Sequence, residues 1–376
     1  MNASNLTVGG GVQVGLSLIH EFFVNYSKMH DFLIVCTDTF AVKYLDCSSL
    51  KICTVTSSPS KIRSRRKVVS ELNAIEKDFN PDLVFSIFGP SYWRPKSFHL
   101  CGFALGWITN PNSIAYDVLP LRNKIKRRLD SMYKLSHLRN EVDHFIVETL
   151  DVKIKLEKLG FERNSITVIG NTCSHLYDNM PEILEKISRE SGVFRFITIS
   201  HNYPHKNILI LNDVVKEMKN IDSEFKFEFG ITISDDEYSK YFYHNSKFIK
   251  NLGVLNPKNC LYAYANANAL FLPTLLESFS ASYPEAMKSE LPIATSDLSF
   301  ARELCGDAAI YFDPLDAKNI ATKLIELAKN SNYQKALIEK GNERFKDFET
   351  SRSRAKKYIS LFKEILSKNE ADSSKH

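Results

Sequence analysis

Short apolar runs rich in β-branched residues alternate with longer helical patterns along this chain, and the alternation occurs twice. The first series of expected strands is 32–36, 83–88, 98–103, 144–147 and 166–169, and the second is 194–200, 225–231, 269–272, 292–295 and 309–312. Strands that alternate with helices predict parallel sheets covered by helices on both faces. A chain of 376 residues, 44% of them hydrophobic, is therefore expected to fold as two α/β domains in series.

Domain boundaries are expected where strand patterns are missing. We predict an N-terminal domain over 1–172 and a C-terminal domain over 193–348, because the segment between them has no apolar strand run. Residues 349–376 are predicted to form a last helix that packs back on the N-terminal domain and ends in a polar tail. Ligands of open parallel sheets bind outside the carboxyl ends of the strands, so functional residues are expected there.

Composition excludes several classes of protein. No stretch approaches the roughly 18 to 20 apolar residues of a spanning helix, and the N-terminus lacks a signal-peptide pattern, so a cytoplasmic protein is expected. Seven scattered cysteines without a C-x-x-C pair are typical of reduced core residues, which disfavours a disulfide framework and a structural zinc. The net charge of +5 is too small to indicate nucleic-acid binding unless it is clustered.

Three successive glycines, Gly9, Gly10 and Gly11, precede an apolar-periodic helical pattern over 12–23. The free amides of such a helix start attract an anion, and residues without Cβ let a sugar approach closely. A plain loop-to-helix turn explains the triplet equally well. The G-x-G-x-x-G spacing is missing, so the triplet is not a dinucleotide fingerprint.

A second candidate segment, 200–207, follows the first strand of the second series and contains Lys206. A lysine beside a helix N-terminus, at the carboxyl end of a strand, is suited to a diphosphate. Taken alone, a surface lysine is the simpler interpretation.

The most informative segment is 269–287, in which an expected strand ends in a loop that carries Glu277 and a helix follows that contains Glu285. Carboxylates accept paired hydrogen bonds from sugar diols. The alternative is that both are solvent-facing acids near a helix N-terminus, where the helix dipole favours them. Two acids alone do not decide between these interpretations.

The order of features over 257–327 resembles the retaining glycosyltransferases of the group 1 family, which is family 4 in the sequence-based classification. The shared features are a helix, a strand ending in proline, an acid, a small-Phe-small run, a second acid eight residues after the first, and a Glu-x-x-Gly-Asp-Ala turn. Weaker resemblance covers the glycine loop, 205–207 and 145–171. The resemblance implies the GT-B fold, which is two Rossmann-like, doubly wound α/β domains facing each other across a cleft.

The resemblance also implies roles for single residues. Glu277 matches the acid that contacts the donor sugar and is the expected catalytic residue, and Glu285 matches the acid that hydrogen-bonds the ribose. The remaining positions match groups near the donor phosphates: the diphosphate lysine is Lys206, the loop amides are those of Ser278 and Phe279, and the N-terminal loop is that of Gly10 and Gly11.

The chain departs from the family pattern at several positions. Ser278 and Ser280 stand where the family usually has glycine, and the segment 200–202 lacks the arginine that usually accompanies the lysine, so phosphate affinity is lower or His201 substitutes. The usual first-domain histidine near the reacting carbons is also missing, and His99, at the start of a strand, is interpreted as structural. No apolar strand precedes the glycine loop, which leaves open a truncated start.

The function implied is the transfer of a hexose or related sugar from a nucleotide-sugar to a glycan or lipid-linked glycan acceptor, with retention of the anomeric configuration. Bacterial surface polysaccharide synthesis (O-antigen, capsule or lipopolysaccharide) is the expected context. Because no Asp-x-Asp motif ends a strand, no essential metal is expected, and no cofactor besides the nucleotide-sugar substrate. The alternatives are a GT-B sugar-nucleotide 2-epimerase and a non-catalytic nucleotide-sugar-binding protein. A pyridoxal phosphate phosphorylase is disfavoured because no lysine has a matching context.

Positive charge is concentrated in 121–139, where the only acid is Asp130 and the cations are Arg122, Lys124, Lys126, Arg127, Arg128, Lys134 and Arg139. One interpretation is a first-domain helix that packs its apolar stripe inward and leaves its charges in water. The other is that the cations, extended by a second basic run over 61–67, dock the domain on the anionic cytoplasmic face of the membrane, near a lipid-linked acceptor. Nucleic acid is disfavoured because neither run is interleaved with aromatic residues.

Overall fold

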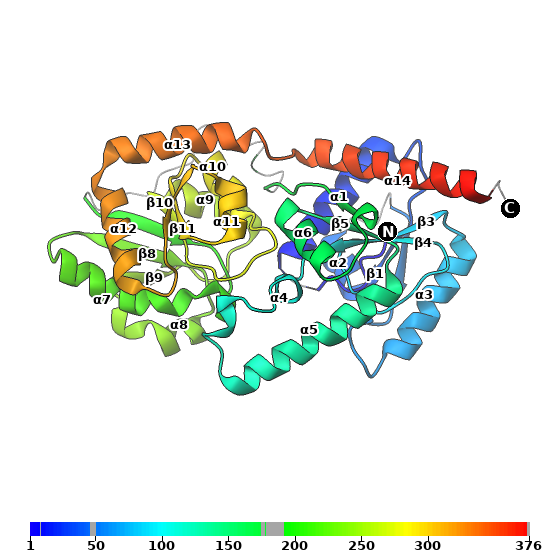
Figure 1. The fold of residues 1–376 in the computed structure, drawn as a ribbon, viewed down its shortest axis with the longest axis horizontal. Coiled ribbons are helices and arrows are strands. Elements are labelled where there is room, and N and C mark those ends of the chain that lie inside the picture. The colour runs from blue at the N-terminus through cyan, green and yellow to red at the C-terminus, as the bar shows by residue number, and fades with distance from the viewer. Residues whose placement is uncertain (8, 46–49, 174–176, 178–191, 374–376) are drawn as a thin grey trace. The chain divides into compact units, whose positions relative to one another are not determined.

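The computed structural model describes residues 1–7, 9–45, 50–173, 177 and 192–373, and its chain forms two compact units (Figure 1). The first unit comprises 1–111, 125–171 and 349–376, and the second comprises 112–124 and 172–348. The sequence analysis assigned 112–124 to the first domain, whereas the structure groups this segment with the second unit. The reason is local contact, because the Ser113 hydroxyl donates to the Leu275 carbonyl at 3.3 Å. Most of the expected connection over 173–192 lies outside the described residues.

The first unit is built on parallel strands in two ladders. One ladder pairs β1 (Ile34–Thr37) with β2 (Ile52–Val55), and the other has the order β3 (Leu83–Ser86), β4 (Phe98–Phe103), β5 (His144–Val147) and β6 (Ile166–Val168). A single residue, Asn2, forms parallel bridges to both Val35 of β1 and Ser86 of β3. The backbone of 1–3, centred on Asn2, therefore joins the two ladders edge to edge.

Helices cover the strands of the first unit: α1 (Gly10–Tyr26), α2 (Asp38–Tyr44), α3 (Arg65–Phe79), α4 (Gly106–Thr109), α5 (Leu121–Glu141), α6 (Leu150–Lys158) and α14 (Ser351–Ser373). The first residues of α5 belong to the second unit, so the division of the chain falls within this helix. The last helix, α14, lies along α1, where the Phe22 ring meets those of Tyr358 and Phe362 at 6.2 and 5.9 Å (red and blue in Figure 1). The apolar stripe of α14 is thus part of the core of the first unit.

The second unit contains one six-stranded parallel sheet in the order β12-β11-β10-β7-β8-β9. Its strands are β7 (Phe194–Thr198), β8 (Phe227–Ile231), β9 (Ile249–Asn251), β10 (Ala269–Leu272), β11 (Ile293–Ser296) and β12 (Ala309–Phe312). The chain runs outward from β7 to β9 and then returns to β10, which pairs with β7 on its other side. The strand order therefore reverses between β7 and β10, as in a doubly wound fold.

Both faces of this sheet are buried, because adjacent residues on a strand point to opposite faces. Phe196 belongs to the core beneath α7 (Leu211–Ile221) and α12 (Ala317–Lys329), whereas Ile197 belongs to the core beneath the helices on the other face. Those helices are α9 (Pro257–Ala265), α10 (Ser282–Lys288) and α11 (Ser299–Cys305), and α8 (Asp235–Tyr241) and α13 (Ser331–Phe345) complete the unit. No helix of the described chain combines the length and apolarity needed to cross a membrane.

Candidate functional site

The candidate site lies in the second unit, at the point where the strand order reverses. The loop after β7 (199–206) and the loop after β10 (273–281) leave the carboxyl ends of two adjacent parallel strands. In open α/β sheets this crevice is where ligands bind. It holds two of the residues singled out from the sequence, Lys206 and Glu277.

Lys206 and Glu277 form an ion pair between these two loops. Both side chains are largely buried, with 18% of the lysine and 10% of the glutamate exposed. The Thr274 hydroxyl donates a second hydrogen bond to the same carboxylate oxygen at 3.0 Å. The carboxylate is therefore held in one orientation by a cation and a hydroxyl.

Backbone contacts fix the two loops to each other. The Leu275 amide donates to the carbonyl of His205 at 2.7 Å, and the Thr274 hydroxyl oxygen lies 3.2 Å from the same carbonyl. Lys206 ends a short 3₁₀ turn over 204–206, and Asn207 follows in the left-handed region, with its side-chain amide donating to the Pro314 carbonyl at 2.8 Å. Helix α7 begins only at Leu211, so Lys206 stands on a turn before the helix and not at its first residue.

Ser278 and Phe279 occupy the loop between β10 and α10, directly after Glu277. Ser278 is buried, and the Phe279 ring packs edge-on against Phe348 with 6.2 Å between centroids. Packing on both residues fixes the course of the backbone next to the ion pair. The backbone of Ser278 and Phe279 therefore lies beside the ion pair of Lys206 and Glu277, since both residues directly follow Glu277 in the chain.

Glu285 lies in α10, and its carboxylate accepts a hydrogen bond from the Tyr264 hydroxyl at 3.0 Å. Tyr264 comes from α9 and is completely buried. Burial raises the pKa of Glu285 to about 7, because the surrounding protein disfavours the charged form more than the tyrosine hydrogen bond favours it. Glu285 is therefore a carboxyl group that changes its charge near neutral pH.

The glycine triplet belongs to the first unit, so it is described apart from the residues above. Gly9 caps α1 with a φ of 80°, a conformation that favours glycine, and Gly10 and Gly11 are the first residues of the helix. A Cβ at Gly10 would meet no atom within 4 Å, whereas one at Gly11 would contact the Phe88 ring at 3.4 Å. Packing within the unit therefore does not require a glycine at position 10.

Comparison with known proteins finds a family to which the second unit is similar. Residues 179–344 match the family described as "Glycosyl transferases group 1". The match covers most of the second unit, which is similar to the group 1 glycosyltransferases. A curated relative, O-antigen chain mannosyltransferase B of Escherichia coli, is 26% identical over 101 residues, which are 27% of this chain and 26% of that protein. The alignment thus spans about a quarter of that relative.

Solved structures extend the likeness to both units. WaaG, a glycosyltransferase of lipopolysaccharide biosynthesis, superposes with a TM-score of 0.73 at 10% identity over 96% of this chain and 98% of its own. Anabaena Alr3699/HepE in complex with UDP and glucose gives 0.71 at 11% identity over 96% and 98%, and a Rickettsia africae glycosyltransferase gives 0.69 at 15% over 97% of both chains. At such low identity the likeness shows the fold, which is the expected GT-B architecture.

Sequence reasoning missed two supporting residues of the candidate site. Thr274 orients the Glu277 carboxylate, and its only sequence signal is a hydroxyl that follows the strand-ending proline. Tyr264 holds Glu285 from another helix, 21 residues earlier, and no local pattern marks it. Across the described residues, no group of three or more His, Cys, Asp or Glu side chains is placed to hold a metal ion.

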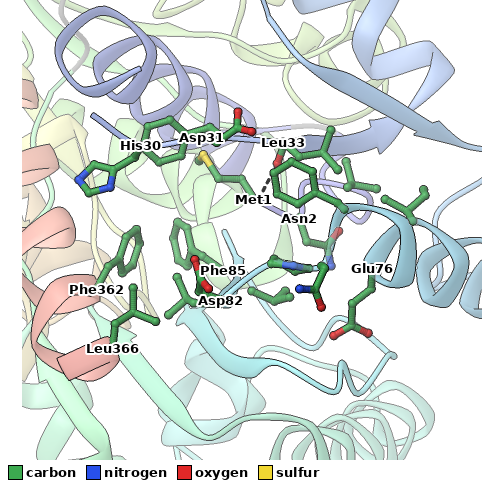
Figure 2. Close-up of a pocket in the computed structure, with 18 of the residues that line it drawn as sticks. Met1, Asn2, His30, Asp31, Leu33, Glu76, Asp82, Phe85, Phe362 and Leu366 are labelled. Atoms are coloured by element: carbon green, nitrogen blue, oxygen red, sulfur yellow. Dashed lines mark hydrogen bonds between the residues drawn. The ribbon is translucent and has the colours of Figure 1, made fainter. Parts of the chain in front are cut away.

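The first unit contains a separate cavity of about 370 Å³ (Figure 2). Its walls include Leu33, Asp82 and the α14 residues Phe362 and Leu366, and the Met1 ammonium within it donates to the Leu33 carbonyl at 2.7 Å. Leu33 and Asp82 immediately precede β1 and β3, so the cavity lies at the amino ends of the strands. Ligands of doubly wound sheets bind at the opposite ends, so we do not assign the donor to this cavity.

His99 is buried within β4, where Nδ1 donates to the Glu141 carbonyl at 2.6 Å and Nε2 accepts from the Ser86 hydroxyl at 2.8 Å. Burial lowers its pKa to about 4, so the ring is neutral at physiological pH. Both ring nitrogens are thus engaged in joining neighbouring segments of the first unit.

Proposed function

We propose that this chain is a retaining glycosyltransferase that moves a sugar from a nucleotide-sugar to a glycan or lipid-linked glycan acceptor. The observation that carries the proposal is the Lys206–Glu277 pair at the strand-order reversal of a unit that is similar to the group 1 glycosyltransferases. The likeness to an O-antigen mannosyltransferase supports a context in surface polysaccharide synthesis, of the O-antigen, capsule or lipopolysaccharide type.

In this proposal the positive charge of Lys206 stabilises the diphosphate. Departure of a nucleoside diphosphate develops negative charge on its bridging oxygen, and a preorganised cation lowers the free energy of that transition state. The loop amides of Ser278 and Phe279 supply further donors, and the amides at Gly10 and Gly11 face the donor phosphate. We propose that these groups suffice without an obligatory divalent cation, so turnover should survive excess EDTA. A complete loss of turnover that Mg²⁺ restores would contradict this part of the proposal.

Glu277 orients the donor sugar in the proposed mechanism. Its carboxylate accepts hydrogen bonds from sugar hydroxyls, and the Thr274 hydroxyl keeps it fixed. The acceptor hydroxyl attacks on the face that the diphosphate leaves. Its proton passes to the leaving diphosphate oxygen while the new glycosidic bond forms, so Glu277 is not a covalent nucleophile. Glu285 holds the ribose hydroxyls.

A screen of nucleotide-sugars by thermal shift would test donor binding first. A ligand at 100 times its dissociation constant adds about 2.7 kcal/mol to the free energy of unfolding, which is a clear rise in melting temperature. UDP-sugars and GDP-sugars are the first probes, since Alr3699/HepE binds UDP and UDP-glucose and the curated relative is a mannosyltransferase. No shift with any nucleotide-sugar or nucleoside diphosphate would contradict the proposal.

Product analysis then separates the transferase from its alternatives. With a donor that binds, a transferase forms product only when an acceptor is added, and NMR of the product should show the donor's anomeric configuration. A changed sugar-nucleotide without acceptor would instead identify a 2-epimerase. Donor binding without turnover across a panel of glycan and lipid-linked acceptors would identify a non-catalytic binding protein.

A further inference from the structure

Helix α5 presents its apolar stripe to solvent. Spacings of four, four and three residues place four apolar side chains on one face of the helix. Their exposed fractions are large: Leu121 73%, Ile125 54%, Leu129 61% and Met132 67%. The sequence interpretation that the stripe packs inward is therefore wrong for these four residues, whereas Leu135, which continues the stripe, is partly buried against the core.

The opposite face of α5 packs on the first unit through polar as well as apolar side chains. Leu138 and Glu141 are buried near its carboxyl end. Arg127 lies over the Trp107 ring at 5.1 Å, and Lys134 pairs with Asp130 at 2.9 Å. The buried Leu138 and Glu141 and the contact of Arg127 with Trp107 fix the rotation of the helix, so that the apolar stripe faces outward.

Cations flank the exposed stripe. Arg122, Lys126 and Arg128 are all exposed and fall on either side of the apolar residues at 100° per residue. An amphipathic helix with an apolar face and basic edges, lying on the outside of a protein, fits the interface of an anionic bilayer.

The second basic run is attached to the same region. Arg65, the first residue of α3, donates to the Tyr133 hydroxyl of α5 and lies over the Tyr92 ring at 4.2 Å. Ile62, three residues before Arg65, is 77% exposed between the exposed Lys61 and Arg63. The loop over 61–63 therefore repeats, next to α5, the combination of an exposed apolar side chain with neighbouring cations.

We propose that the exposed face of α5, together with the loop over 61–63, docks the protein on an anionic lipid surface. Charge complementarity favours an anionic lipid as the binding partner, because cations on the edges of an apolar stripe match lipid phosphates above acyl chains. A second copy docked through the same face would bring cations against cations, because the stripe and its flanks carry no acid. This inference does not rest on the proposed transfer reaction, because docking needs neither donor nor acceptor. If both hold, the protein would work beside a lipid-linked acceptor.

Co-sedimentation of the full chain with vesicles, without any nucleotide, tests the proposal. Binding should be strong to phosphatidylcholine vesicles that contain 30% phosphatidylglycerol, weak to pure phosphatidylcholine, and should fall as salt rises. The variant Arg122→Ser/Lys126→Ser/Arg128→Ser should bind about 100-fold more weakly, because each cation near an anionic surface contributes about fivefold. The variant Ile125→Ser/Leu129→Ser/Met132→Ser should also lose binding, although its charge is unchanged.

The matched control is Lys318→Ser/Lys335→Ser/Lys340→Ser, which removes the same charge from exposed positions of the second unit. It should bind anionic vesicles as the unchanged protein does, and all three variants should keep the melting temperature. Equal binding to neutral vesicles, no binding to either kind, or equal losses in the control would overturn the proposal. So would a dimer in sedimentation velocity that the apolar variant abolishes, since the stripe would then join two copies of the chain.

Discussion

The ammonium group of Lys206 pairs with the carboxylate of Glu277, 71 residues later in the chain. Each group comes from a loop at the carboxyl end of a different strand, and the two strands are neighbours because the strand order reverses between them. A diphosphate bound in this crevice would compete with Glu277 for the lysine. Ligand binding is therefore expected to loosen the pair and release the carboxylate toward the sugar.

Replacing Lys206 with Ala should weaken binding of the nucleoside diphosphate at least as much as binding of the intact nucleotide-sugar. The free diphosphate carries more charge at the position where the cation is lost. Isothermal titration with both ligands measures the difference. Lys318→Ala, a substitution of an exposed lysine away from the site, serves as the control. Unchanged affinity for the diphosphate would show that Lys206 acts only as the partner of Glu277.

Glu277→Gln should keep the fold and lower turnover by about 100-fold or more. The amide fills nearly the same space but holds the sugar hydroxyls and Lys206 less well, so the donor is positioned poorly in the transition state. Steady-state rates with saturating donor and acceptor give the effect, and circular dichroism checks the fold. A rate near that of the unchanged protein would remove Glu277 from the proposed site.

Glu285→Ala should act mainly on nucleotide affinity. A ribose contact is made in the ground state and the transition state alike, so its loss weakens donor binding with little change in the rate at saturation. Donor titration together with turnover at saturating donor separates the two effects. A lower rate at unchanged donor affinity would contradict the ribose assignment.

The raised pKa of Glu285 predicts that stability depends on pH. Below its usual pKa near 4.5 the group is protonated in both the folded and the unfolded chain. Between 4.5 and about 7 the unfolded chain releases this proton and the folded chain retains it, so this contribution to stability falls as pH rises through that window. The loss is on the order of 3 kcal/mol at about 1.4 kcal/mol per pKa unit.

Urea unfolding of Glu285→Gln at pH 5, 6, 7 and 8 measures this contribution. The variant should lose less stability across the series than the unchanged protein, because glutamine does not titrate. Glu339→Gln, at an exposed position of α13, should leave the pH profile unchanged. Parallel profiles for Glu285→Gln and the unchanged protein would refute the raised pKa.

Ten strands were expected from apolar runs, and each has a counterpart within two residues at either end. Two further strands were missed for a physical reason. In β2 the run Ile52–Val55 is short and only partly buried, and in β9 the run Ile249–Asn251 contains a lysine and an asparagine. The backbone of β2 pairs with β1, and that of β9 pairs with β8. These two strands can therefore form without a strong apolar pattern in their own sequences.

The candidate site shows which features of the structure the local sequence cannot predict. The positions of Lys206 and Glu277 at strand ends follow from the run of strands, but their contact depends on β7 and β10 being neighbours, which is a property of the whole sheet. Helix α5 shows the same limit. Its periodicity identified the stripe, but the rotation of the helix is set by Trp107 and by residues packed beneath it. The sequence pattern shows which residues share a face of a helix, whereas packing against the rest of the protein determines which face is buried.

The bridge centred on Asn2 has a consequence for local unfolding. In the described chain, β1 is joined to the β3–β6 ladder edge to edge through 1–3: Met1 and Ala3 bond Val35, and Asn2 bonds the backbone of Phe85 and Ile87. Few hydrogen bonds must break for the β1–β2 pair to separate, so this pair should open at a lower free energy than the rest of the sheet. Native-state hydrogen exchange should show amides of 34–37 and 52–55 exchanging well before those of 98–103 and 144–147. Helix α1 would stay protected by its packing against α14, so the β1–β2 pair would open as a cooperative unit of its own.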